Sequence, residues 1–282
     1  MKIKRDLSGF LKQAELVAFD TETTGLHAIS NHIVEIAAVK FRLEDDRVER
    51  FQELVNPGVP MPEEVIPIHG ITDEMVANSR RAPEVLADFI KFCGPSPILI
   101  AHNAPFDISF VAEELRRARL TFGPCRVIDT VDIFRRLFPD LPGYSLLILA
   151  RMFEVAETQE HRALADSEMV RALFAIAAPR LPSKMDDSSM TDHLTVYDID
   201  SFLTEGLTLP KRFAVLPEVI EQGGRLEIEY SKPGQTPHSR IVRPDGLQKM
   251  NGVVYLTGFC ELADANRTFR LDRISSFKII DD

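Results

Sequence analysis

The stretch LVAFDTETTGL, residues 16–26, constrains the fold more than any other part of the chain. Residues 16–19 read as a buried strand, and Asp20 and Glu22 follow directly. Side chains at positions i and i+2 of a strand leave the same face, so both carboxylates point the same way at the strand's end. Burying a carboxylate costs several kcal/mol unless a partner compensates its charge. The pair alone is compatible with a solvated strand end, an N-cap or a metal site.

Two more acids and a histidine occur later in the chain. HNAPFD places Asp107 at the start of a helix expected over 107–120, and HRALAD places Asp166 near the start of one expected over 163–178, five residues after His161. Singly, the acids are helix-start residues favoured by the helix dipole, and the histidine is an ordinary loop residue. Together with the first pair they make four carboxylates and one imidazole on one core. Carboxylates that lie close together repel one another unless a cation lies among them.

The hydrophobic pattern of the first 180 residues predicts a mixed α/β sheet. Strands are expected over 16–22, 33–42, 47–55, 96–102 and 126–130, and helices over 82–93, 107–120, 130–137, 145–153 and 163–178. Three strands in succession, followed by alternation of strands and helices, are not typical of an all-parallel sheet.

The composition changes after the last expected helix. Pro, Ser, Asp and Met without periodicity predict a linker over 181–208. Beyond it, short strands separated by KPG, PDG and NG turns predict a small β barrel or sandwich. We therefore expect a first domain over 1–180 and a second over 209–282.

Composition limits the class of protein. The net charge of −10 excludes a broad basic surface that holds a duplex by charge alone, although a metal site would supply its own local positive charge. Cys93, Cys125 and Cys260 form no CxxC pair and are typical of reduced core thiols. No apolar run approaches the roughly 20 residues of a membrane span, and the N-terminal stretch lacks the apolar region of a signal peptide. We expect a cytoplasmic protein without a membrane segment.

The three acidic segments resemble a known family. FDTETTGL, HNAPFD and HRALAD, in this order, are similar to the three motifs of DEDDh-type 3′–5′ exonucleases, and most similar to those of epsilon-type proofreading subunits of bacterial DNA polymerase III. PIHGIT, residues 67–72, also occurs in that branch, and the resemblance covers about residues 14–178. It implies a ribonuclease H-like mixed sheet with flanking helices.

The resemblance also implies a metal centre. Asp20, Glu22, Asp107 and Asp166 would hold two divalent cations, Mg²⁺ or Mn²⁺, and His161 would act as general base. Two such ions about 3.5–4 Å apart can straddle a scissile phosphate, activating water and stabilising the leaving oxygen. Histidine titrates near neutral pH, which suits the role of base. Because five residues separate His161 from Asp166, the two do not share a helix face, and we expect His161 on a mobile loop.

Substrate contacts are expected around the metal acids. By the resemblance, the segment with Thr23 and Leu26 would cup the terminal nucleotide. Asn103 and Phe106 lie beside Asp107 in the sequence and are the other candidate substrate contacts. Phe106 would either stack on a base or pack in the core. His69, in the IHGIT stretch, would either line the pocket or cap a turn.

The C-terminal part resembles a WYL domain, which implies a small SH3- or Sm-like β-barrel. The matching residues are Tyr230, Arg240, Pro244, Gly252, Tyr255, Leu256, Arg270, Arg273 and Ile274. Val254 stands where the family has tryptophan, and the chain contains no Trp, so one aromatic face is lost.

WYL domains are regarded as ligand-sensing modules. Arg240, Arg270 and Arg273 with Tyr255 would bind the phosphate and base of a nucleotide or a single-stranded nucleic acid. Alternatively, Arg270 and Arg273 pair with acids such as Asp272 or Glu261.

Three functions are compatible with these patterns. The first is a metal-dependent 3′–5′ exonuclease that releases nucleoside monophosphates from single-stranded DNA ends. The second is an RNA-processing exonuclease of the same mechanism, because the 2′-hydroxyl is read by local contacts. The third is a ligand-sensing regulatory protein with a vestigial nuclease core. The WYL-like domain lies where a proofreading subunit would carry its polymerase-binding tail. A stand-alone repair or processing nuclease is therefore favoured over a subunit that works with a polymerase partner.

Overall fold

The structure of the protein is a computed structural model in which two compact units are distinguished. It describes residues 11, 14–28, 31–181, 196–197, 199, 209–231, 236–250 and 253–280. One unit comprises Met1–Gly25 and His32–Ile199, and the other comprises Leu26–Asn31 and Asp200–Asp282. The expected linker over 181–208 lies outside the described residues except at 181, 196–197 and 199, and Gly252 also lies outside them.

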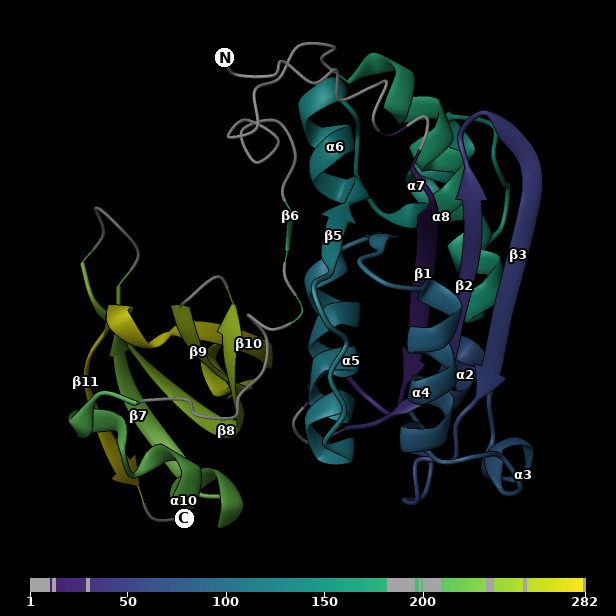
Figure 1. Ribbon diagram of the computed structural model, residues 1–282. Helices are drawn as coiled ribbons and strands as arrows, with labels where there is room; N and C mark the ends of the chain where they lie inside the picture. Colours follow the sequence, from purple (N-terminus) through teal and green to yellow (C-terminus); the bar gives the residue numbers. More distant parts are fainter. Residues whose placement is uncertain are drawn as a thin grey trace, which may run out of the picture. The chain divides into compact units, whose positions relative to one another are not determined.

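A six-stranded mixed sheet forms the centre of the first unit, in the order β3-β2-β1-β4-β5-β6 (Figure 1). Its strands are β1 (Leu16–Thr23), β2 (Ile33–Arg42), β3 (Asp45–Leu54), β4 (Ile98–Ala101), β5 (Arg126–Asp129) and β6 (Val196–Tyr197). β1 pairs antiparallel with β2 and parallel with β4, and β5 pairs parallel with β4 and antiparallel with β6. The mixed α/β sheet predicted from the sequence is confirmed.

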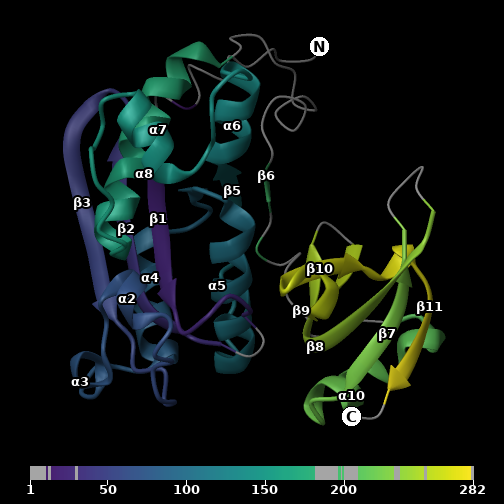
Figure 2. The same ribbon diagram turned by 180° about the vertical axis from the view of Figure 1, so that it is seen from behind.

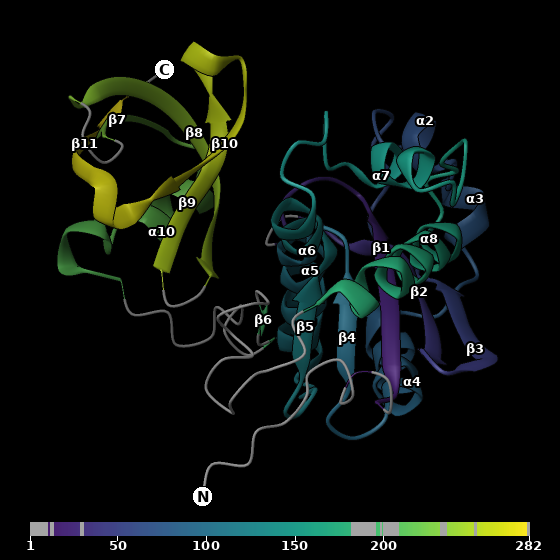
Figure 3. The ribbon, with the colours of Figure 1, turned by 90° about the horizontal axis from the view of Figure 1, so that it is seen from above.

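Helices cover both faces of this sheet. They are α2 (Ile66–His69), α3 (Asp73–Val76), α4 (Ala82–Cys93), α5 (Ala104–Ala118), α6 (Thr130–Leu137), α7 (Leu146–Met152) and α8 (Ala163–Ala177). α4 lies in front of the sheet in Figure 1, whereas α7 and α8 lie in front in the reverse view of Figure 2, and the view from above separates the two layers (Figure 3).

Alternation along β1 divides the core between these layers. Leu16 and Ala18 pack in the cluster that includes residues of α6, α7 and α8, such as Phe174. Phe19 points to the other face, where its ring lies 6.0 Å from that of Phe89 on α4. Side chains of alternating residues point to opposite faces, so Asp20 and Glu22 continue the face of Leu16 and Ala18.

The second unit is built on a five-stranded antiparallel sheet in the order β10-β9-β8-β7-β11. Its elements are α10 (Leu216–Glu221), β7 (Arg225–Tyr230), β8 (His238–Met250), β9 (Val253–Cys260), β10 (Ala265–Arg270) and β11 (Ile274–Ile280). Within the described ranges no pairing of β10 with β11 closes the sheet, so the closed SH3- or Sm-like barrel stays a prediction. Val254 packs against the core of this unit, so the position of the missing tryptophan faces the core.

The composition predicts reduced core thiols and no membrane-spanning segment. Cys93, Cys125 and Cys260 are all buried and free of disulfides. In the part of the chain that the structure describes, no helix has the length and apolar character needed to cross a membrane.

Candidate active site

The two acids of β1 meet an acid of α8. Carboxylate oxygens of Asp20, Glu22 and Asp166 lie within 4.8 Å of one another. Asp20 and Glu22 are partly exposed at the end of β1, and Asp166 is buried in the first turn of α8. α8 covers the face of the sheet to which the β1 acids point. The fold therefore brings Asp166 next to Asp20, which lies 146 positions earlier in the sequence.

Asp107 is fixed beside the same strand from another helix. α5 begins three residues earlier than expected, so Asp107 lies within its first turn. Asp107 Oδ1 accepts hydrogen bonds from the backbone N–H of Thr21, at 3.0 Å, and from its hydroxyl, at 2.8 Å. Thr21 separates Asp20 from Glu22, so these bonds join the predicted fourth acid to the strand that carries the other two. Asp107 is not part of the group within 4.8 Å.

The carboxylates raise one another's pKa. Burial first, and then the charges of neighbouring acids, raise the pKa of Glu22 to about 9 and that of Asp20 well above its usual value. Burial raises the pKa of Asp107 to about 7, although the bonds from Thr21 oppose the shift. Negative charge is therefore costly here unless a cation is bound.

The two carboxylate oxygens of Asp166 differ in their hydrogen bonds, and this difference bears on whether a metal ion fits the site. Its Oδ2 accepts a hydrogen bond of 2.5 Å from Gln159 Nε2, whereas its Oδ1 is buried without a hydrogen-bond partner in the described structure. A buried oxygen without a partner is costly unless it binds something. The donors are all carboxylate oxygens, which are the hard ligands that Mg²⁺ and Mn²⁺ prefer.

His161 directly precedes the N-terminus of α8. Its backbone is left-handed, with φ of 49°, and its side chain is exposed. Burial raises the pKa of Asp166, and the hydrogen bond from Gln159 and then the neighbouring His161 oppose that shift. The histidine thus lies in the irregular segment before the helix that carries Asp166. The mobility expected of this segment stays a prediction.

Thr23, Leu26 and His69 occupy different settings near the end of β1. Thr23 is buried, and its hydroxyl donates to the carbonyl of Gly25 at 2.6 Å, which stabilises the turn after the strand. Leu26 is 61% exposed in the same turn. His69 is buried at the end of α2, where its Nδ1 accepts the N–H of Ile71 at 3.0 Å, and burial lowers its pKa. His69 therefore caps the turn after α2, and its use in lining a substrate pocket stays a prediction.

Asn103 and Phe106 lie at the start of α5. Asn103 has φ of 62° and an exposed side chain. The ring of Phe106 lies 5.0 Å from that of Phe110 and is half-buried, so it contributes to packing.

Asp129 is a buried acid that sequence reasoning did not single out. Its Oδ1 accepts the backbone N–H of Asn103 at 3.0 Å and that of Val131 at 2.9 Å, so it caps α6 and holds the loop before α5. Burial raises its pKa to about 6. An Asp between a strand and a helix is a common N-cap signal, which could have identified it.

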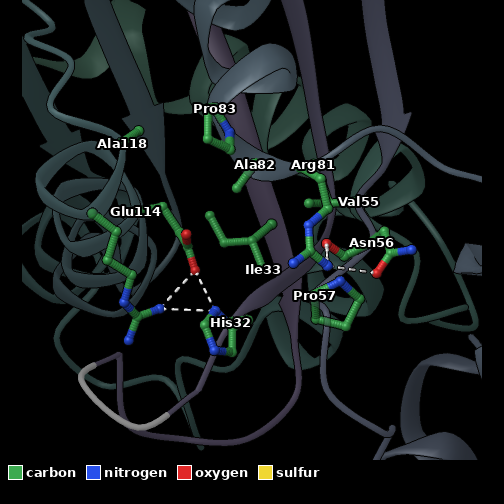
Figure 4. Close-up of a pocket in the computed structure, with 11 residues that line it drawn as sticks. His32, Ile33, Val55, Asn56, Pro57, Arg81, Ala82, Pro83, Glu114 and Ala118 are labelled. Atoms are coloured by element: carbon green, nitrogen blue, oxygen red, sulfur yellow. Dashed lines mark hydrogen bonds and ion pairs between the residues drawn. The ribbon is translucent and has the colours of Figure 1, made fainter.

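A pocket of about 370 Å³ lies at the start of β2, between the turn after β3 and the ends of α4 and α5 (Figure 4). Glu114 Oε1 and Arg117 both contact His32 Nδ1 at 2.9 Å, and Arg81 donates to the Asn56 side chain at 3.0 Å. The charged groups that line this pocket thus pair with one another or with polar neighbours.

In the second unit, the structure brings together two of the four predicted ligand residues. Tyr255 and Arg270 are directly opposite each other in the β9–β10 pair. Arg240 lies on β8, opposite Ile228 of β7, in a different strand pair. Arg273 follows Asp272 in the short turn before β11.

An acidic partner also exists for one of these arginines. Arg270 forms an ion pair of 2.8 Å with Asp272, as the alternative reading predicted. Glu261 instead pairs with Arg225 at 3.0 Å and with Arg243 at 3.4 Å.

Comparison with known proteins finds relatives for the first unit. DNA polymerase III PolC-type from Caldanaerobacter subterraneus subsp. tengcongensis is 38% identical over 162 residues, which is 57% of this chain and 11% of that protein. The PolC-type polymerase from Pediococcus pentosaceus is 40% identical over 189 residues, which is 66% of this chain and 13% of that protein. The chain therefore spans 11% to 13% of the length of these relatives.

Solved structures share the fold of the first unit. The nuclease domain of 3′hExo, a DEDDh family member bound to rAMP, is 18% identical with a TM-score of 0.52, over 61% of this chain and 96% of that chain. A 3′-exonuclease solved for recognition of a histone mRNA stem-loop is also 18% identical, with a TM-score of 0.53, over 61% of this chain and 84% of that chain. The mixed sheet with flanking helices is thus the ribonuclease H-like exonuclease fold.

Two family models match the chain. The model described as exonuclease, RNase_T, matches residues 17–174, and the WYL domain model matches residues 211–279. The first match covers every predicted metal acid and His161, and the second covers the antiparallel sheet. The chain belongs to the exonuclease family and carries a WYL domain after its nuclease domain.

Proposed function

We propose that the protein is a metal-dependent 3′–5′ exonuclease that releases nucleoside monophosphates from single-stranded DNA ends. The observation that carries the proposal is the convergence of Asp20, Glu22 and Asp166 within 4.8 Å, with Asp107 anchored next to them. Membership of the exonuclease family supports the hydrolysis of phosphodiesters. DNA is the proposed polymer because relatives that are 38% and 40% identical are, by name, DNA polymerases.

The acids and the histidine have different proposed roles. Asp20, Glu22, Asp107 and Asp166 would hold two divalent cations, Mg²⁺ or Mn²⁺, which when bound supply Lewis-acid activation of water and of the leaving oxygen. His161 would accept the proton of the attacking water at a ring nitrogen, which its exposed position before α8 allows. Gln159 would hold Asp166 in place through Oδ2.

The substrate end is proposed to lie against the turn after β1. The exposed side chain of Leu26 can contact a terminal base, and Thr23 maintains the turn that presents it. Asn103 offers an exposed amide at the start of α5, and the half-buried ring of Phe106 offers an edge beside it. His69 would act by fixing the turn after α2.

For the WYL domain we propose binding of a nucleotide or single-stranded nucleic acid at Tyr255 and Arg270, on a sheet that closes as an SH3- or Sm-like barrel. An aromatic ring beside a guanidinium suits a base and its phosphate. Arg240 and Arg273 would extend the positive charge from neighbouring elements.

The test uses single-stranded DNA labelled at its 5′ end, with the full-length protein and Mg²⁺. The expected result is progressive shortening from the 3′ end with release of nucleoside monophosphates, and complete loss on addition of EDTA. Asp20→Asn should abolish digestion, and Asp88→Asn, at an exposed position on α4, should leave it unchanged. Digestion by Asp20→Asn would overturn the metal assignment. Faster digestion of RNA would indicate the processing role, and binding without cleavage in Mg²⁺ and Mn²⁺ would indicate the vestigial core.

A further inference from the structure

Glu35 is a fully buried acid on β2, directly opposite Glu22 on β1. Its Oε1 accepts hydrogen bonds from Arg162 Nη2 at 2.6 Å and from Gln52 Nε2 at 2.9 Å. Its Oε2 accepts bonds from Arg162 Nε and from the backbone N–H of Ala163, both at 3.0 Å. A bidentate pair of arginine and carboxylate fixes both the distance and the orientation of its partners.

The hydrogen bonds of Glu35 cap the N-terminus of α8, which its own N-cap residue leaves uncapped. Arg162 is the N-cap residue of α8, and its side chain makes no capping hydrogen bond. The N–H of Ala163, the first residue of the helix, donates to Glu35 instead. A carboxylate at this end also interacts favourably with the positive end of the helix dipole. A residue of β2 therefore caps the start of α8.

Two groups of the candidate active site depend on that starting point. His161 immediately precedes Arg162 and has a left-handed backbone, with φ of 49°. Asp166 lies in the first turn of α8 and carries the buried, unpartnered Oδ1. Because β2 pairs with β1, the strand pair that presents Glu22 also holds the end of the helix that presents Asp166.

We propose that Glu35 is a positioning residue for the exonuclease reaction, acting through Arg162 and the Ala163 amide to hold His161 and Asp166 against the acids of β1. The proposal rests on the function proposed above. Displacements of about 1 Å in a catalytic group can cost about a hundredfold in rate. Glu35 should therefore affect the rate of the chemical step more than the binding of DNA.

The experiment compares full-length Glu35→Gln with the wild type on single-stranded DNA at saturating Mg²⁺. Glutamine keeps the shape and one oxygen acceptor but removes the charge. We expect kcat to fall by about tenfold or more and KM to change by less than about twofold. Glu168→Gln is the matched control, because Glu168 also joins α8 to the sheet but lies beyond the first turn of the helix: it pairs with Arg50 of β3 at 2.7 Å and with Arg171 at 2.8 Å. Both constants should stay unchanged in this variant.

A second variant covers the case in which Glu35→Gln does not fold. Arg162 has a side chain that is 33% exposed, so Arg162→Lys should fold, and lysine keeps the charge but loses the bidentate geometry. Its kcat should also fall while KM holds, and the double variant should lose no more than the worse single variant.

The outcomes separate this proposal from the proposed function. An unchanged kcat in either folded variant, a loss confined to KM, or additive losses in the double variant would overturn the positioning role while the wild type remained active. An inactive wild type would instead overturn the proposed exonuclease function.

Discussion

At the scale of single residues, the raised pKa of Glu22 makes the stability of the metal-free protein depend on pH. Its pKa in the folded protein is raised to about 9, by burial and then by the charges of Asp166, Glu35 and Asp107. An unfolded glutamate has a pKa of about 4.3. The folded state binds this proton more tightly, so the free energy of unfolding falls as pH rises between these values. The metal-free protein should melt at a lower temperature at about pH 8.5 than at about pH 6, and Mg²⁺ should raise the melting temperature more at the higher pH.

Thermal melts in EDTA and in Mg²⁺, at both pH values, measure this dependence. Glu22→Gln is the control, because it removes the titrating group with little change in shape. Its metal-free melting temperature should depend less on pH than that of the wild type. Equal stabilisation by Mg²⁺ at both pH values would contradict the prediction.

The sequence could predict the acids of β1 and α8 that converge in the structure, but not the residues that hold them in place. Asp20 and Glu22 are recognisable because their spacing of two places both carboxylates on one face of a strand. The partnership of Glu35 with Arg162 spans 127 positions and depends on the packing of α8 against β2. No local pattern reports such a contact, so it required the structure.

At the scale of elements, most of the sheet and its helices were predictable, including the four-residue strands β4 and β5, whereas the four-residue helices α2 and α3 and the strand β6 were not. The expected strand over 33–42 and helix over 82–93 coincide with β2 and α4. α2 and α3 have four residues each, too few for a periodic signal, and they pack on a small cluster around Val34 and Ile71 instead. β6 has two residues in a stretch read as linker, and its pairing with β5 is a tertiary contact.

The cap of α6 leads to a prediction about stability. Asp129→Ala removes the acceptor for two backbone N–H groups, so the free energy of unfolding should fall by about 1–3 kcal/mol. Asp129→Asn keeps an acceptor oxygen and should lose less than half as much. Urea unfolding of the full-length protein measures both. Asp140→Ala, at an exposed position in the next loop, is the control and should change little. Equal losses for the Ala and Asn variants would exclude the capping role.

At the scale of the whole molecule, the two family matches raise the question of how the WYL domain contributes. If Tyr255 and Arg270 bind the substrate strand, Tyr255→Ala with Arg270→Ala should raise KM for single-stranded DNA by about tenfold and leave kcat unchanged, because loss of base stacking costs about 1–3 kcal/mol. Direct binding would be measured in the Asp20→Asn background, which prevents cleavage.

Lys278→Ala supplies the comparison for that variant, because Lys278 is a largely exposed cation on β11 of the same sheet. It should alter neither constant. Unchanged KM and DNA affinity in the Tyr255 and Arg270 variant would remove the recruitment role. Thermal shifts with free nucleotides would then test the sensing role.

The alternation of β1 has a consequence for evolution of the chain. Leu16 and Ala18 contribute hydrocarbon to one face of this strand, and Asp20 and Glu22 continue the same face as oxygen donors. Loss of a single residue between Ala18 and Asp20 would turn both acids towards α4 and its phenylalanines. An insertion or deletion of one residue in this strand should therefore abolish folding and activity together. A substitution of Asp20 or Glu22 can instead abolish activity while the protein still folds.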